Sequence, residues 1–268
     1  MTNIFAEKYN LYPPEDKPVL EYYKEYFDEV FISLIPFSKL NFEKIRDFKE
    51  NEIFDKRIEE IKHRIFDENR LKNYPLQEEF FSDIEEYYFT EKINWDQIIK
   101  NSEIKNFKDL NKALMTSIGA LKKELEEHKI LETLQNFAKR DEILIPSEGS
   151  FDVHSKIGIY NCLFENNISQ INVIEEFHES QKKIDLSNIS EIEFIEKINF
   201  KDYYIFSEDK QILFSIDWDY FFFFIGINSQ TISKESIEKN FNGFWANIET
   251  THLWTWEKGE INKKLKLK

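Results

Sequence analysis

The spacing of apolar residues changes about halfway along the chain. In the first half they recur every three or four residues, which is the period of an α-helix, whereas after residue 170 they gather in short β-rich runs. The clearest helical stripe consists of Phe107, Leu110, Leu114, Ile118, Leu121 and Leu125. It predicts a core helix, and helical spacing continues through Leu131, Leu134 and Phe137.

Three further helices are predicted in the first half. A proline-rich stretch indicates an extended arm over residues 1–18. Behind this arm, a helix is expected to begin near Val19 and to end before Pro36. Apolar positions then predict a helix over 53–65 and a shorter one over 78–88.

The second half predicts the strands of a sheet. β-branched and aromatic residues are concentrated in the runs 171–174, 203–206, 212–216 and 220–227, and a short strand is expected over 143–145. Ser190 with Glu193 fits a capping box that opens a helix, and Ser233 is a second candidate cap. Residues 207–210 have the composition of a hairpin turn.

These patterns predict an α+β fold. A helix-rich N-terminal half is expected to pack on a mixed or antiparallel sheet that comes mainly from the C-terminal half. No internal repeat or linker divides the chain, so a single domain is expected over residues 1–268. Within it, residues 19–140 are predicted to be mainly helical, 141–257 to hold the sheet, and 258–268 to form a basic tail.

Charge narrows the range of partners. The 268 residues carry a formal net charge of −15 at pH 7, from 51 acidic and 36 basic side chains. Such a field repels phosphate backbones and anionic membranes, so neither a nucleic acid nor a membrane is an expected partner. A basic protein partner or a cation fits this charge, and the alternative is that it mainly maintains solubility.

Targeting signals are not evident. The N-terminus does not resemble a signal peptide, and no stretch reaches the roughly 20 apolar residues of a membrane span. The single cysteine, Cys162, cannot form an internal disulfide. These observations favour a cytoplasmic protein, and they do not predict its oligomeric state.

No familiar catalytic motif occurs in the chain. It lacks GxSxG, the GxxxxGK phosphate loop, GxGxxG, HExxH and an EF-hand loop. No cofactor is therefore predicted, although a divalent metal stays an alternative. Whether the protein is an enzyme is left open, because catalytic triads and metal sites depend on geometry.

Two carboxylates and a histidine are the candidate chemical groups. Asp217 and Asp219 flank Trp218, and in an extended segment they would share one face, where they can bind a divalent cation or share a proton. The alternative is a solvent-facing edge or a bend between strands that uses polar residues, with Trp218 turned inward. If His252 and Glu249 converge with them, a metal or acid/base site results.

Tryptophans are concentrated in the last quarter of the chain. Trp245, Trp254 and Trp256 are candidates for partner binding, because tryptophan is a frequent anchor of protein interfaces. Core packing is the alternative for the same side chains. The sequence leaves open which of the two applies.

Three segments carry a resemblance to a known family. They are LIPSEGSFD at 144–152, ILFSIDWDYF at 212–221 and TTHLW at 250–254. Together they resemble an uncharacterised bacterial family described only as a domain of unknown function, and the resemblance covers most of the chain. It implies a bacterial cytoplasmic setting, and it implies no activity, cofactor or site residue.

The leading hypothesis from the sequence is a non-enzymatic protein-interaction protein. It would bind a protein partner, with a basic one favoured, through an acidic surface with aromatic anchors. Its composition is similar to that of the immunity proteins that neutralise bacterial toxins, a likeness that many folds share. The alternative is a metal-dependent hydrolase or transferase that uses Asp217, Asp219 and His252, and a structural subunit of a homo-oligomer is a third hypothesis.

Overall fold

Two compact units make up the protein. The computed structural model describes residues 5, 11–41 and 82–266. Unit 1 takes in the chain up to Ile35 together with Glu148–Trp254, and unit 2 takes in Pro36–Ser147 and the chain from Thr255 onward. The expectation of one domain over 1–268 stays a prediction.

Unit 1 is built around a seven-stranded sheet. Its helices are α1 (Val19–Tyr23), α9 (Val153–Glu165), α10 (Glu191–Lys197) and α11 (Lys234–Asn240). Its strands are β1 (Glu29–Leu34), β5 (Gln170–Glu175), β6 (Gln181–Asp185), β7 (Asp202–Ser207), β8 (Ile212–Ser215), β9 (Phe222–Ile227) and β10 (Gly243–Trp245). The strand order is β10-β1-β9-β8-β7-β5-β6, and each neighbouring pair is antiparallel.

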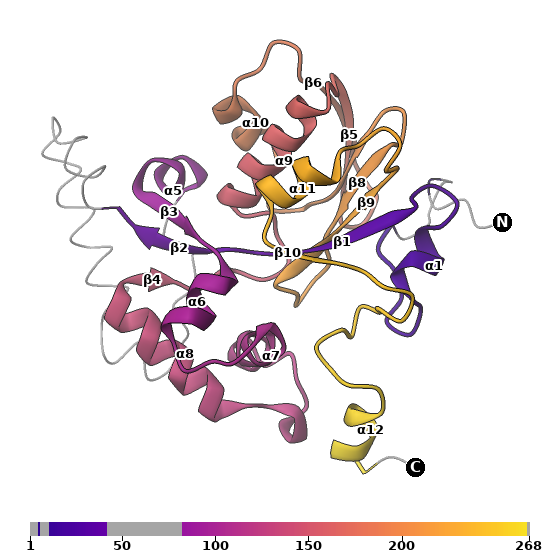
Figure 1. The fold of residues 1–268 in the computed structure, drawn as a ribbon. Coiled ribbons are helices and arrows are strands. Elements are labelled where there is room, and N and C mark those ends of the chain that lie inside the picture. The colour runs from indigo at the N-terminus through magenta and orange to yellow at the C-terminus, as the bar shows by residue number, and fades with distance from the viewer. Residues whose placement is uncertain (1–4, 6–10, 42–81, 267–268) are drawn as a thin grey trace, which may run out of the picture. The chain divides into compact units, whose positions relative to one another are not determined.

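Both faces of the interior strand β9 are buried. Phe223 contacts the rings of Phe151 and Phe241, whereas Phe224, which points to the opposite face, contacts Tyr12 of the N-terminal arm. Figure 1 shows α9, α10 and α11 gathered on one side of this sheet. A strand that is covered on both faces shows no alternation of polar and apolar residues, which explains the run of four phenylalanines.

Unit 2 holds a three-stranded sheet with the order β3-β2-β4 and several helices. Its strands are β2 (Phe37–Leu40), β3 (Thr90–Ile93) and β4 (Ile143–Leu144). Its helices are α5 (Asp83–Phe89), α6 (Trp95–Asn101), α7 (Phe107–Ser117), the 3-10 helix η1 (Lys123–Leu125), α8 (His128–Asp141) and α12 (Glu260–Lys264). Trp95 is fully buried and contacts the rings of Phe37 and Phe107.

The prediction of a helix-rich N-terminal half is wrong. The structure is α+β, but helices are spread along the described chain, and the first half contributes β1, β2 and β3. The helix expected to run from Val19 toward Pro36 ends at Tyr23, and β1 follows between β9 and β10. The reason is that β1 consists largely of β-branched and aromatic residues that are buried between two strands, and tertiary pairing outweighed the helical spacing upstream.

The long helix predicted from Phe107 to Leu125 is shorter in the structure. Helix α7 ends at Ser117, and Gly119 follows with a φ of +72°, a left-handed conformation that glycine adopts without strain. The stripe continues in two separate elements, η1 and α8. The helix predicted over 53–65 lies outside the described residues, and the described part of 78–88 corresponds to α5.

Most local predictions for the second half are confirmed. The four predicted runs correspond to β5, β7, β8 and β9, and the short strand to β4. Ser190 forms a capping box with Glu193, and the Ser233 side chain caps α11. The strands β6 and β10 and the helix α9 were not predicted.

Candidate functional site

One edge of the sheet in unit 1 gathers acidic and aromatic side chains. The antiparallel strands place the end of β5, the start of β7, the end of β8 and the start of β9 at this edge. The Glu176 N–H donates to the Lys201 carbonyl at 2.9 Å, which joins two of the connecting loops. We name this region the acidic edge, and it comprises Glu15, Glu176, Phe177, Phe200, Tyr203, Asp217, Trp218, Asp219 and Tyr220.

Residues 217–220 form the turn between β8 and β9. The Trp218 N–H donates to Asp217 Oδ1 at 2.9 Å, and Asp219 has a φ of +59°. Trp218 is 56% exposed, so the expectation that a bend would turn it inward is wrong. Gly149 supports the turn by donating its N–H to the Tyr220 carbonyl at 3.0 Å. A Cβ on this glycine would lie 3.2 Å from Trp218 Cα, which explains the small residue here.

Asp217 is held in an unfavourable electrostatic environment. Burial is the largest cause of its raised pKa, and the like charges of Glu176, Asp219 and Glu15 raise the pKa further, while the Trp218 N–H lowers it. Within the described ranges, no lysine, arginine or histidine forms an ion pair with any of these four carboxylates. The edge therefore carries negative charge that the described chain does not neutralise.

The charge of Asp217 acts on Tyr12 and on three further tyrosines. Burial is the largest cause of the raised pKa of Tyr203, Tyr204 and Tyr220, and the charge of Asp217 raises each pKa further. These phenols stay protonated near neutral pH. They can donate hydrogen bonds, but they are not available as bases.

His252 packs against the ring of Tyr220, a residue of the acidic edge. Its ring centroid lies 4.3 Å from that of Tyr220 and 5.1 Å from that of Tyr12, both with T-shaped geometry. The side chain is 4% exposed, and burial lowers its pKa to about 4. The nearby Pro13 backbone raises the pKa and so offsets part of this effect. By distance and angle, neither ring nitrogen forms a hydrogen bond with a described residue. The ring is therefore neutral near pH 7 and has unused hydrogen-bonding capacity.

The structure brings three of the four predicted site residues to one region. Asp217 and Asp219 share the turn and both raise the pKa of Tyr220, whose ring His252 contacts. Glu249 is exposed in the loop after β10. In the part of the chain that the structure describes, no group of three His, Cys, Asp or Glu side chains could hold a metal ion. The metal-dependent hypothesis therefore gains no support from these residues.

The three tryptophans predicted to bind a partner are packed to different extents. Trp254 is 9% exposed and contacts the ring of Phe222, and Trp256 is 8% exposed. Trp245 is partly buried and donates its Nε1–H to Glu238 at 2.8 Å. Their role in partner binding stays a prediction.

Sequence reasoning missed the aromatic residues that the acidic edge exposes. Trp218, Phe177 and Phe200 are 56%, 63% and 69% exposed. Their one signal in the sequence is that each stands next to charged residues between two β-rich runs. That pattern indicates a loop but does not distinguish an inward from an outward side chain.

A second buried polar group lies at the start of α9. The Asp152 carboxylate accepts the N–H groups of His154 and Ser155 and the hydroxyl of Ser155. His154, Ser155 and Lys156 are also buried. The contacts of Asp152 satisfy the first N–H groups of the helix, which accounts for this carboxylate as a helix cap.

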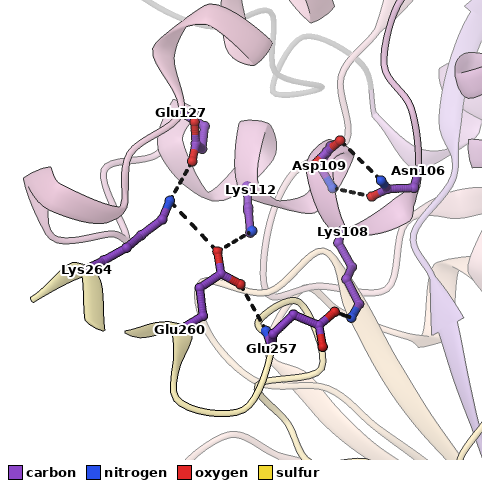
Figure 2. A network of polar contacts seen from close by, with 8 residues as sticks. All are labelled: Asn106, Lys108, Asp109, Lys112, Glu127, Glu257, Glu260 and Lys264. Atoms are coloured by element: carbon purple, nitrogen blue, oxygen red, sulfur yellow. Dashed lines mark hydrogen bonds and ion pairs between the residues drawn. The ribbon is translucent and has the colours of Figure 1, made fainter. Parts of the chain in front are cut away.

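Unit 2 contains a charged cluster in which acids and bases are paired. Lys112 of α7 is 8% exposed, and its Nζ lies 3.0 Å from Glu260 Oε1 and 4.4 Å from the centroid of the Trp256 ring. Lys264 Nζ lies 2.7 Å from Glu127 Oε1 and also approaches Glu260. Figure 2 shows these side chains converging from α7, α12 and the segment before α8.

Two further contacts join the C-terminal segment to α7. Lys108 forms an ion pair with Glu257, and the Asn111 amide donates to Thr255 Oγ1 at 2.6 Å in a buried position. We name this set of contacts the α7–α12 network (Figure 2). The predicted basic tail is thus docked within unit 2 as far as the structure describes it.

The fold and the site define a mixed α+β protein with an unneutralised acidic edge. The chain belongs to the family described as Protein of unknown function (DUF2711), whose model matches residues 15–256. The resemblance that the sequence carries is thereby confirmed. No curated protein and no solved structure matches the chain. No helix among the described residues is long and apolar enough to cross a membrane.

Proposed function

We propose that this protein binds a basic protein partner and that the acidic edge is the docking surface. The observation that carries the proposal is the combination of four carboxylates without a cation partner in the described chain and three exposed aromatic side chains at the same edge. A lysine- or arginine-bearing surface offers the missing charge.

The exposed apolar side chains support this surface over others. Among the described residues, the large hydrophobic side chains that are exposed are Phe164, Phe177, Phe200, Trp218 and Ile248. Three of these five belong to the acidic edge. Aromatic residues are enriched in the anchors of protein interfaces, and clustering separates an interface from ordinary scattered exposure.

The chemistry of the edge favours binding over catalysis. Its tyrosines are protonated near neutral pH, and its carboxylates do not form a metal cluster with other described residues. A strongly acidic patch also accelerates the encounter with a basic partner. This extends the hypothesis from the sequence and moves its aromatic anchor from the C-terminal tryptophans to Trp218.

The proposal is tested by affinity capture from a native lysate of the source organism with four immobilised proteins. These are the natural protein, the Trp218→Ala variant, an Asp217→Asn/Asp219→Asn double variant, and Ile248→Ala as a matched control, because Ile248 is exposed outside the edge. We expect a stoichiometric, basic protein to be retained by the natural protein and the control, and to be lost from both edge variants. Equal capture by all four proteins, or no stoichiometric partner, contradicts the proposal.

A further inference from the structure

We propose that the acidic edge recognises an arginine side chain of its partner, with the guanidinium stacked on Trp218 and hydrogen-bonded to the carboxylates of Asp217 and Asp219. This inference rests on the proposed function and names the group that the edge binds. It replaces a general attraction for positive charge by a preference for one cation.

The tight turn at 217–219 provides both elements that a guanidinium uses. An exposed indole stands between two carboxylates in three consecutive residues. A guanidinium is planar, stacks on aromatic faces and presents its N–H groups as a fork that matches carboxylates. The ammonium of lysine is a compact point charge that cannot stack and bond in this way at once.

The partial burial of Asp217 adds to the preference for arginine. Burial and like charges already disfavour its ionised form, so a cation that binds here must give up part of its own hydration. A guanidinium is more weakly hydrated than an ammonium and loses less.

His252 supplies a second, independent indication of a ligand. It is 4% exposed, its ring packs against Tyr220 of the edge, and both ring nitrogens lack a partner among the described residues. Buried polar groups in native proteins are normally hydrogen-bonded. The neutral ring leaves one nitrogen as a hydrogen-bond acceptor, and the ring itself contacts Tyr220 of the edge.

The test compares two peptides of equal charge, N-acetylated and amidated hexa-arginine and hexa-lysine, by isothermal titration calorimetry with the full chain. We expect the natural protein to bind hexa-arginine about tenfold more tightly. Trp218→Ala is expected to reduce this ratio to about one while charge-driven binding persists. The Asp217→Asn/Asp219→Asn variant is expected to weaken both peptides, and Ile248→Ala to change neither. Thermal melting of each variant verifies that it is folded.

The two proposals fail in different ways. Equal affinity of the natural protein for both peptides, or a ratio that survives Trp218→Ala, overturns arginine recognition and leaves the proposed function standing if the aspartate variant still weakens binding. Failure of both peptides to bind, or binding that the aspartate variant does not change, overturns arginine recognition and counts against the acidic edge as a docking surface.

Discussion

In the α7–α12 network of unit 2, Glu260 lies 3.0 Å from the Lys112 ammonium. At the acidic edge of unit 1, the described charges that act on Asp217 are the like charges of Glu176, Asp219 and Glu15. Both carboxyls lose solvent on folding, and burial alone would raise the pKa of each. The Glu257 N–H and Lys112 outweigh burial at Glu260 and lower its pKa, while Asp217 keeps a raised pKa. Acids elsewhere in unit 1 are also paired, as Asp202 is with Lys182. Carboxylates that stay unneutralised at the acidic edge therefore indicate a role toward something outside the chain.

The largest expected difference is in the free energy of unfolding lost on replacing Trp256 and Trp218 by alanine. Trp256 is 8% exposed and contacts Lys112 and Lys264 through its ring, whereas Trp218 is 56% exposed. Trp256→Ala should lower the free energy of unfolding by about 3 to 4 kcal/mol, because it removes a packed side chain. Trp218→Ala should change it by less than about 0.5 kcal/mol. Urea unfolding of both variants tests this, and a similar loss in the two would end the distinction between network and edge.

The next largest expected effect is a loss of stability at low pH that is caused by the lowered pKa of His252. A histidine with a folded pKa of about 4 and an unfolded value near 6.5 costs no stability above pH 6.5, and the loss grows as pH falls toward 4. The loss should approach about 3 kcal/mol at pH 4.

The variant His252→Phe isolates this contribution. Its stability should decline less than that of the natural protein between pH 6.5 and 4, because other acids titrate equally in both proteins. Parallel curves of unfolding free energy against pH would show that the ring is not held neutral as the structure indicates.

Breaking the ion pair between Lys112 and Glu260 is expected to cause a smaller loss of stability. Glu260→Gln leaves the largely buried Lys112 ammonium without its carboxylate and should destabilise the protein by about 2 kcal/mol. In the Lys112→Met background, the same Glu260→Gln change should lower the stability clearly less, because no buried ammonium then loses its partner. A double-mutant cycle with a coupling energy near zero would contradict the pairing.

The smallest expected change in the free energy of unfolding comes from Asp217→Asn at the acidic edge. Asp217→Asn keeps an oxygen for the Trp218 N–H but removes a charge with a raised folded pKa. Such a charge costs stability above its folded pKa and costs nothing below the unfolded value of 3.8.

The variant should therefore be more stable at pH 7, by about 0.5 kcal/mol, and equal to the natural protein below pH 3.8. The same substitution should weaken binding of a basic peptide. A loss of stability at pH 7 would mean that Asp217 has a structural role, like the acids of the network.

The sequence by itself determined the elements whose signals are local. The apolar stripe from Phe107 predicted α7, and Ser190 with Glu193 predicted the start of α10, because helical spacing and capping depend on neighbours three or four residues away. The β-rich runs predicted β5, β7, β8 and β9 for the same reason. At the site, the sequence named Asp217, Asp219, His252 and Glu249 as candidates but left open whether they converge, and their role stays a prediction.

The tertiary structure alone decided which side chains face solvent and which segment becomes a strand. Residues 29–34 are a strand because β9 and β10 pair with them from 188 or more positions along the chain. Trp218 is exposed and Trp254 buried although both stand among aromatic residues, because the turn after β8 projects from the sheet and the ring of Trp254 meets Phe222 and Phe244. Burial and charge pairing arise from contacts between distant segments, and a local pattern does not encode them.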